Sequence, residues 1–291
     1  MRIAVTGASG MLGSALLKEL SKTHKIFACS RNLSYSNKNI YWSQFDLINK
    51  TKLEDWIYQS KPDILIYCAA IVNLELCETQ KDLAKNIHFD SILKIIDIIK
   101  KTHMKLIYIS SDGVFNGHKT GKYTELDDVD PLNVYAKTKI LGEEAVLGYD
   151  HGMVLRTNIL GDKENSFSSW LIDSLKLEKE LNLFSDVFFS PIHVSRLAKI
   201  INLIIERQRF GLYHCSSRES ISKYSFGILL AKELHFSYQK IKSIQLSQIN
   251  SNLIRPRNMA LDVTKFEKDF EITLPNISDC VMSIKESFNL K

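Results

Sequence analysis

Three glycines at a fixed spacing near the start of the chain constrain its fold more than any other feature. Gly7, Gly10 and Gly13 follow the apolar, strand-like run 2–6, and leucines at helical spacing come after them. A glycine turn between a strand and a helix lets the backbone approach a pyrophosphate, and the helix N-terminus supplies free N–H groups. The sequence therefore predicts a dinucleotide-binding turn, although a plain tight turn would leave the same pattern.

The end of the next predicted strand indicates which dinucleotide is preferred. An NAD enzyme has an acidic residue here that binds the adenosine ribose, but this chain has Ser30, Arg31 and Asn32 after the run 25–29. The guanidinium of Arg31 presents a fork of donors that suits a 2′-phosphate. We therefore expect NADPH to be preferred over NADH, unless Arg31 is only a solvated turn residue.

A tyrosine and a lysine four residues apart supply the candidate chemistry. In a helix, Tyr135 and Lys139 lie on one face, about one turn apart. A phenol is a poor acid at neutral pH, and a nearby positive charge favours its ionised form. We therefore expect Lys139 to bring the pKa of Tyr135 closer to neutral pH.

Context separates this pair from a chance match, because Tyr238 and Lys242 have the same spacing. The apolar run 106–109 reads as a buried strand, and it ends in two hydroxyl residues, Ser110 and Ser111. Tyr135 follows Ser111 by 24 residues, through a loop rich in glycine and aspartate. No comparable strand end precedes Tyr238, so Tyr135 is the candidate catalytic tyrosine.

These motifs resemble the extended short-chain dehydrogenase/reductases, which use a Ser or Thr with a Tyr-x-x-x-Lys, and the resemblance covers nearly the whole chain. Segment 110–115 (Ser-Ser-Asp-Gly-Val-Phe) is similar to the Ser-Thr-Asp-Tyr-Val-Phe of the sugar-nucleotide reductases typified by dTDP-4-dehydrorhamnose reductase. Segment 255–262 is similar to their Arg-Pro…Asn-x-x-Leu-Asp. The resemblance implies that the catalytic residues are Ser111, Tyr135 and Lys139.

The same resemblance implies the binding residues, and it implies no metal ligand. Asn86 corresponds to a structural asparagine of the extended family, although an asparagine in such a helix can simply be exposed. The implied substrate-binding residues are Asp112, Asn158, Ile159, Pro191 and Arg255. The implied cofactor-binding residues are Gly7, Ser9, Gly10, Met11, Leu12, Gly13, Ser30, Arg31, Asp46, Leu47, Cys68, Ala69, Ala70, Asn86, Ser110, Tyr135 and Lys139.

Two sites, one at Gly113 and one at Asn158 and Ile159, depart from the pattern of the reductases. Gly113 stands where the reductases have Tyr and where the sugar-nucleotide dehydratases have a Glu that acts as acid and base. Asn158 and Ile159 stand where the reductases commonly have Ser-Trp. Gly113 weighs against dehydration, and both departures leave open whether the substrate differs.

Alternating strand and helix patterns through residue 156 predict an α/β fold with a Rossmann-type, doubly wound parallel sheet. We expect residues 1–156, with about 192–215 returning to the sheet, to form the NADP-binding domain. Residues of about 157–191 and 216–291 then form a smaller substrate-binding lobe. Locally, a capping box at 51–54 predicts a helix start, and a longer amphipathic helix is predicted from Leu83, Ile87, Leu93, Ile96 and Ile99.

Composition excludes several other functions. The net charge of +5 is spread along the 291 residues without a basic run, which disfavours nucleic-acid binding. The five cysteines and eight histidines show no metal-binding spacing. A strand-like start leaves no room for a signal peptide, and no apolar stretch suits a membrane span, so we expect a cytoplasmic protein. It could form a homodimer.

The sequence thus predicts an oxidoreductase that uses NADPH to reduce a nucleotide-linked keto-sugar, most simply a 4-keto-6-deoxyhexose. Hydride goes to the carbonyl carbon while Tyr135 protonates the oxygen. Two alternatives stay open. One is a sugar-nucleotide epimerase of the same fold, which usually retains NAD, and the other is a regulatory subunit that binds NADP without turnover.

Overall fold

A seven-stranded sheet is built mainly from the first half of the chain. The computed structural model describes residues 1–33, 37–161, 166–249 and 255–289, and it divides them into two compact units. Unit 1 comprises residues 1–114, 131–156 and 198–213, and unit 2 comprises residues 115–130, 157–197 and 214–291. These units group residues that contact one another, so the predicted binding roles of the two domains stay a prediction.

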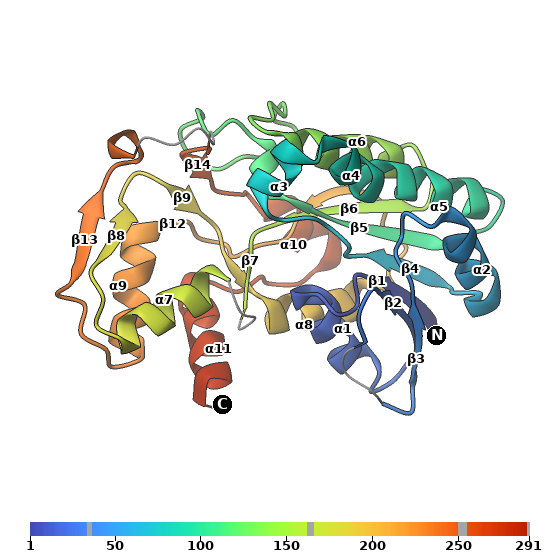
Figure 1. The fold of residues 1–291 in the computed structure, drawn as a ribbon, viewed down its shortest axis with the longest axis horizontal. Helices are drawn as coiled ribbons and strands as arrows, with labels where there is room; N and C mark the ends of the chain where they lie inside the picture. The colour runs from blue at the N-terminus through green and yellow to red at the C-terminus, as the bar shows by residue number, and fades with distance from the viewer. Residues whose placement is uncertain (34–36, 162–165, 250–254, 290–291) are drawn as a thin grey trace. The chain divides into compact units, whose positions relative to one another are not determined.

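The large sheet has the strand order β11-β6-β5-β4-β1-β2-β3 (Figure 1). Parallel pairing is continuous from β3 through β2, β1 and β4 to β5, and the order reverses between β1 and β4. Ligands of doubly wound sheets bind at the carboxyl ends of the strands at this switch point. The predicted fold class is therefore confirmed. The strands are β1 (Arg2–Thr6), β2 (Lys25–Ser30), β3 (Ile40–Gln44), β4 (Ile64–Tyr67), β5 (Lys105–Ser111), β6 (Gly152–Thr157) and β11 (Gly211–His214).

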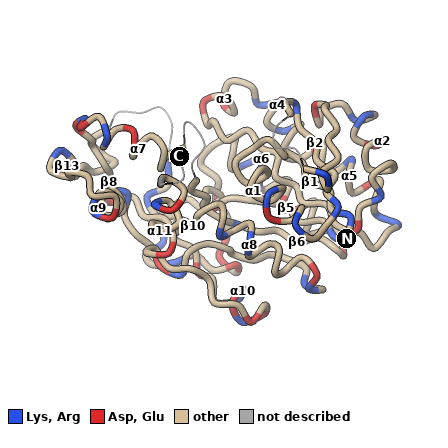
Figure 2. Tube along the Cα trace, turned by 90° about the horizontal axis from the view of Figure 1, so that it is seen from below, with Lys and Arg blue, Asp and Glu red and all other residues tan. Residues whose placement is uncertain are grey.

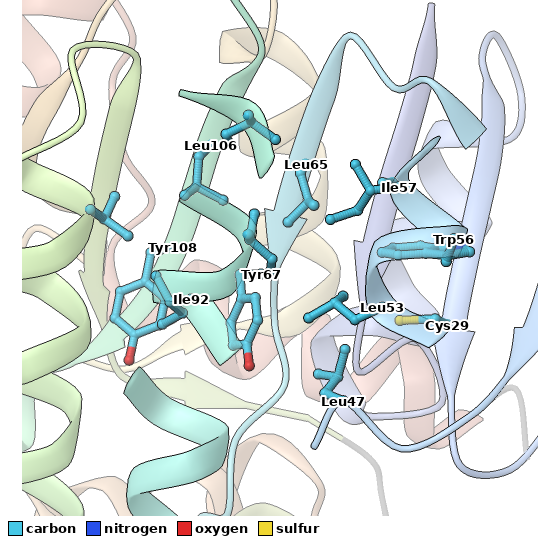
Figure 3. Close-up of a cluster of buried hydrophobic side chains, with 14 of the residues drawn as sticks. Cys29, Leu47, Leu53, Trp56, Ile57, Leu65, Tyr67, Ile92, Leu106 and Tyr108 are labelled. Carbon is cyan, nitrogen blue, oxygen red and sulfur yellow. The ribbon is translucent and has the colours of Figure 1, made fainter. Parts of the chain in front are cut away.

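One face of the sheet is covered by α2 (Lys50–Ser60), α5 (Ser91–Ile99) and α6 (Val134–Leu147). Their apolar side chains interlock with the strands in a buried cluster, in which Tyr67 and Tyr108 pack 5.9 Å apart (Figure 3). On the other face lie α1 (Met11–Leu20) and the part of α8 (Val194–Ile204) from residue 198 onward, joined by a hydrogen bond from Asn202 to Glu19 (Figure 1). The sheet is thus buried on both faces, as its apolar strands require.

Two local predictions in this unit are wrong. Helix α2 begins after Asn49, whose side chain accepts from Lys52 N at 3.0 Å, so the capping residue lies two positions before Thr51. The long helix consists of α4 (Lys81–Lys85), a π-helical turn η1 (Asn86–Asp90) and α5. A π turn holds more residues per turn than an α turn, so it rotates the buried face of the helical segment after it. Leu93, predicted to be buried, is therefore 42% exposed.

The described residues of unit 2 form three small sheets, four α-helices that lie wholly within the unit, the short 3-10 helix η3 (Leu246–Gln248) and the first turn of α8. The sheets are β7 (Ile159–Leu160) with β10 (Ile192–His193); β12 (Ile221–Ser222), β9 (Phe188–Phe189) and β14 (Asn258–Met259); and β13 (Ile241–Ile244) with β8 (Leu181–Phe184). The helices are α7 (Phe167–Lys176), α9 (Lys223–Glu233), α10 (Thr264–Phe270) and α11 (Ile277–Asn289). Side chains of α7, α9, α11, β8 and β9 form its core cluster.

Charge is distributed rather than concentrated. Lys and Arg are interspersed with Asp and Glu along the trace of the described residues (Figure 2). Within that part of the chain, no helix has the length and apolar character needed to cross a membrane.

Candidate active site

The glycine turn lies at the switch point of the sheet, as predicted. Gly7 has φ +62°, and a Cβ there would lie 2.8 Å from the backbone of Ala69 at the end of β4. Only glycine allows that approach. Gly10 is the N-cap of α1 and caps it with no side chain, so the first N–H groups of the helix remain available to an anion. Thr6 Oγ1 accepts from Cys68 N at 3.1 Å and ties the two strand ends together.

The end of β2 presents one exposed cation. Ser30 is nearly buried and donates to the Asn32 carbonyl, whereas Arg31 is exposed and its backbone oxygen accepts from Gln44 Nε2 at 2.9 Å. The Arg31 guanidinium is thus available to a phosphate beside this strand.

The other predicted cofactor residues of this unit lie in different surroundings. Leu47 is 6% exposed, and its side chain lies in the core cluster (Figure 3). The Asp46 carboxylate accepts a hydrogen bond from Ile48 N at 3.2 Å. Cys68 and Ala69 are half-buried at the carboxyl end of β4, and Ala70 is exposed. Asn86 donates to the Asp82 carbonyl in its own helix.

Strand β5 and helix α6 bring Ser111 and Tyr135 together. The Ser111 hydroxyl acts on the Tyr135 phenol and lowers its pKa, and Gly113 N donates to Ser111 Oγ at 3.1 Å. A Cβ at Gly113 would lie 3.4 Å from Ser111 Oγ and 4.0 Å from Tyr135 Cε1. Gly113 therefore borders the Ser111 hydroxyl and the Tyr135 ring. Asp112 is 3% exposed and accepts from Ser111 Oγ at 3.1 Å.

The first turn of α6, which carries Tyr135, is fixed by two side chains. Asn133 caps the helix by accepting from Ala136 N at 2.9 Å, and Glu78 Oε1 of α3 (Leu74–Thr79) accepts from Val134 N at 2.8 Å. Two of the N–H groups that a helix start leaves unpaired are thereby satisfied. These contacts within the protein hold the backbone that carries Tyr135 in place.

The pKa values of Tyr135 and Lys139 differ from those expected from the sequence. Burial raises the pKa of Tyr135 to about 12, and the nearby Ser111 hydroxyl opposes this rise. Lys139 is 1% exposed; its Nζ donates to the Ile109 carbonyl at 2.7 Å and lies 3.8 Å from the Tyr108 ring centre. Burial also lowers the pKa of Lys139 to about 7. The expectation that Lys139 draws the pKa of Tyr135 toward neutrality is therefore wrong, because burial raises that pKa and Lys139 is not among the groups that shift it.

His88 is a site residue that the sequence did not reveal. Its ring meets the Tyr135 ring edge-on at 5.5 Å, and its Nε2 accepts from Ile71 N at 2.9 Å. Nδ1 therefore carries the proton and donates to Thr138 Oγ1 at 2.7 Å. Burial lowers the pKa of His88 to about 3, so the ring stays neutral. A lone histidine in an apolar helix gives no sequence signal of this role.

Three of the predicted substrate-binding residues of unit 2 lie close to one another. Ile159 of β7 pairs with Ile192 of β10, and the Asn158 carbonyl accepts from Ile192 N at 2.8 Å, so Asn158, Ile159 and Pro191 are neighbours. Arg255 is exposed and precedes Pro256, which packs beside Gly117. Among the described residues, no group of three or more His, Cys, Asp or Glu could hold a metal ion.

Comparison with known proteins adds the family. A family model described as the RmlD substrate binding domain matches residues 1–289. A dTDP-4-dehydrorhamnose reductase from Aggregatibacter actinomycetemcomitans is 26% identical, covering 93% of this chain and 94% of the relative. The methionine adenosyltransferase 2 subunit beta of Xenopus laevis is 30% identical, covering 92% of this chain and 82% of the relative. A crystal structure of dTDP-4-dehydrorhamnose reductase from Bacillus anthracis with NADP has a TM-score of 0.86 at 24% identity, covering 98% of both chains.

Proposed function

The chain belongs to the RmlD substrate-binding-domain family, and on that premise we propose that it is an NADPH-dependent oxidoreductase that reduces the keto group of a nucleotide-linked sugar. The family match confirms the resemblance drawn from the motifs. The substrate class that we infer is a 4-keto-6-deoxy sugar nucleotide, because the reductase relative named above is a dTDP-4-dehydrorhamnose reductase.

One observation carries this proposal: a buried phenol beside a serine hydroxyl at the carboxyl end of β5. The Ser111 hydroxyl acts on the Tyr135 phenol, and both residues lie in the same unit as the glycine turn. Carbonyl reduction needs a proton donor and a second donor that polarises the oxygen. The pair supplies both.

The residues present fit the dinucleotide. The close approach of Gly7 to Ala69 and the uncapped start of α1 suit a pyrophosphate, and the exposed Arg31 suits a 2′-phosphate. Lys139 would hold the nicotinamide ribose. NADPH, when bound, supplies the hydride. NADP in the structure of the Bacillus anthracis protein supports this choice of cofactor.

The chain's own residues manage the proton. Because burial holds the pKa of Tyr135 near 12, the phenol keeps its proton at neutral pH and can release it as charge develops on the substrate oxygen. Ser111 Oγ donates to the same oxygen and orients it. His88, packed edge-on and neutral, keeps the Tyr135 ring in place.

Gly113 bears on which reaction occurs. Dehydration at C5 and C6 of a sugar needs an acid/base side chain beside the serine, and Gly113 offers only hydrogen there. The absence of a side chain beside Ser111 and Tyr135 supports reduction. We also propose that Asp112, Asn158, Ile159, Pro191 and Arg255 contact the substrate.

The test is NADPH oxidation against a panel of dTDP-, UDP- and GDP-linked keto-sugars. We expect stoichiometric oxidation with a 4-keto-6-deoxy sugar and a loss of about 10²-fold or more in turnover for Tyr135→Phe, with NADPH binding retained. Tyr238→Phe is the matched control, because Tyr238 has the same spacing to a lysine and should change little. Equal damage from both substitutions would contradict the assignment of Tyr135.

A dehydration assay sharpens the same test. The protein should not convert dTDP-glucose into a keto-sugar, since position 113 cannot move protons. Loss of water from dTDP-glucose would contradict the reductase proposal outright.

A second candidate function follows from the similarity to methionine adenosyltransferase 2 subunit beta, which is 30% identical over most of this chain. On this alternative the chain binds NADP as a non-catalytic subunit of another enzyme. The Ser111–Tyr135 pair weighs against it. Tight NADPH binding with no oxidation across the whole panel would move the assignment to this alternative.

The remaining proposals concern the domains, location and assembly. We propose that the predicted domain, 1–156 with about 192–215, binds NADP and that the rest binds the sugar nucleotide. A cytoplasmic location suits both small molecules and the free cysteines, of which Cys29, Cys77, Cys215 and Cys280 are buried. A homodimer is the expected assembly, and sedimentation equilibrium tests it.

A further inference from the structure

A buried carboxylate lies directly behind the proposed catalytic residues. Glu143 is one helical turn after Lys139 on α6 and is 2% exposed. Removing an ionised carboxylate from water costs several kcal/mol unless it is paired and hydrogen-bonded. The partners of Glu143 therefore decide what it does.

Glu143 has two partners, one from each of two neighbouring strands. Arg156 of β6, itself 4% exposed, donates from Nε to Oε1 at 3.0 Å and from Nη2 to Oε2 at 2.6 Å. Ser110 of β5 donates from Oγ to Oε1 at 2.5 Å. Two parallel N–H donors on a carboxylate fix its orientation. The carboxylate of Glu143 is thus paired with a guanidinium and held in one orientation.

Glu143 influences the proposed catalytic residues in two ways, through a hydrogen bond and through its charge. Ser110 is the residue before Ser111, so its bond to Glu143 holds the strand end that carries the polarising hydroxyl. The charge of Glu143 also acts on Lys139, on Tyr135 and on Tyr108. Neither effect needs Glu143 to touch a substrate.

We propose that Glu143 is a positioning residue for the reduction: paired with Arg156, its carboxylate places a fixed negative charge one helical turn from Lys139, and its bond to Ser110 holds the strand end that carries Ser111. The inference rests on the proposed function. It assigns a role to a residue that the motif-based analysis did not single out.

The signs of the interactions agree. Burial lowers the pKa of Lys139 to about 7, and the charge of Glu143 is the largest effect that raises it again. The pKa of Tyr135 is raised mainly by burial, and Glu143 adds to that rise. Removing the charge therefore lowers both pKa values, so the proton donor and its lysine would each lose their proton at a lower pH.

Other groups that face Lys139 leave this conclusion unchanged. Cys68, just after β4, is a thiol whose pKa burial raises to about 12, so it stays neutral. His88 of η1 is neutral, and Tyr108 of β5 offers its ring face. The positive charge of Arg156 acts through its pair with Glu143. Glu143 is the ionised acid among these neighbours.

A merely structural ion pair does not explain this arrangement well. Replacing a buried ion pair by apolar residues of similar volume is often neutral or stabilising, so stability alone gives little reason for one here. A charge that tunes a lysine and a tyrosine gives such a reason.

The experiment compares Glu143→Gln with its neighbour Glu144→Gln, which changes an exposed carboxylate on the same helix. Glutamine at 143 retains one acceptor oxygen, which can still accept from Ser110 Oγ and Arg156 Nε, but it loses the acceptor for Arg156 Nη2 together with the charge. We expect the basic limb of the pH profile of kcat/KM to move about one unit lower in Glu143→Gln and to stay in place in Glu144→Gln. A basic limb unchanged in Glu143→Gln, with kcat/KM simply reduced, would overturn the proposal.

NADPH binding followed by fluorescence against pH gives a readout independent of turnover. Because Lys139 holds the ribose only as an ammonium, affinity should begin to fall at a lower pH in Glu143→Gln. This outcome stands even if no keto-sugar is reduced, so failure of the proposed function can be told apart from failure of this inference.

If Glu143→Gln does not fold, Glu143→Asp is the second variant, because it keeps the charge but moves it away from Ser110. Its basic limb should then match the wild type, and a limb one unit lower would contradict the proposal.

Discussion

At the scale of single residues, burial decides what sequence spacing alone cannot. The spacing of Tyr135 and Lys139 predicted a shared helix face and a catalytic pair, and the position of Tyr135 near a helix start is confirmed. The charge states were not predictable, because they depend on how deeply each group is desolvated. Glu143 was missed for the same reason: a glutamate in a helix usually reads as a solvated residue.

Arg31 carries the first prediction at this scale. It is exposed at the end of β2, where a 2′-phosphate would bring two negative charges within reach. Arg31→Ala should weaken NADPH by about tenfold or more and leave NADH nearly unchanged, because only NADPH carries that phosphate. Titration at fixed moderate salt measures both affinities, with the exposed Arg209→Ala as control. Wild-type protein that binds NADH as tightly as NADPH would refute the role of Arg31.

At the scale of elements, the strands and most helices followed from hydrophobic period, but helix 81–99 did not. Its pattern predicted a single stripe through Leu83, Ile87 and Leu93, whereas the π turn at η1 buries His88, Ile92 and Ile95. Apolar spacing along the helix cannot reveal this π turn. His88, which lies in the turn, forms hydrogen bonds with Ile71 and Thr138, and both partners lie in other segments of the chain. The cap of α2 was missed because Asn49 lies just outside the apolar pattern.

His88 makes this element sensitive to acid. Burial lowers its pKa from 6.5 to about 3, so between these values the unfolded chain binds more protons than the folded one. Stability is therefore lost as pH falls through this window, by up to about 1.4 kcal/mol per pH unit. His88→Gln keeps an acceptor for Ile71 but cannot titrate. Its free energy of unfolding in urea should fall less between pH 7 and 5 than that of the wild type.

The exposed His118→Gln variant is the control for this comparison. It should lose as much stability as the wild type over the same pH interval. An identical loss in wild type and His88→Gln would show that His88 does not control acid sensitivity.

At the scale of the whole molecule, the alternation of strands and helices was enough to predict the doubly wound sheet, and the order of its strands confirms it. The contact units were less predictable. Residues 115–130 lie in the chain between β5 and α6, yet they group with unit 2. Asn258 donates to the carbonyls of Lys119 and Gly121, and Tyr123 pairs with Leu261. Such contacts across more than a hundred residues leave no local pattern.

The central claim is hydride transfer from NADPH to a sugar carbonyl, and deuterium tests it most directly. NADPH carrying deuterium at the transferred position of the nicotinamide is incubated with a dTDP-linked 4-keto-6-deoxy sugar, and the product is analysed by mass spectrometry and NMR. The account predicts one deuterium on the former carbonyl carbon for each NADP⁺ formed. A product without deuterium, or a sugar recovered unchanged while NADPH stays bound and intact, would contradict it.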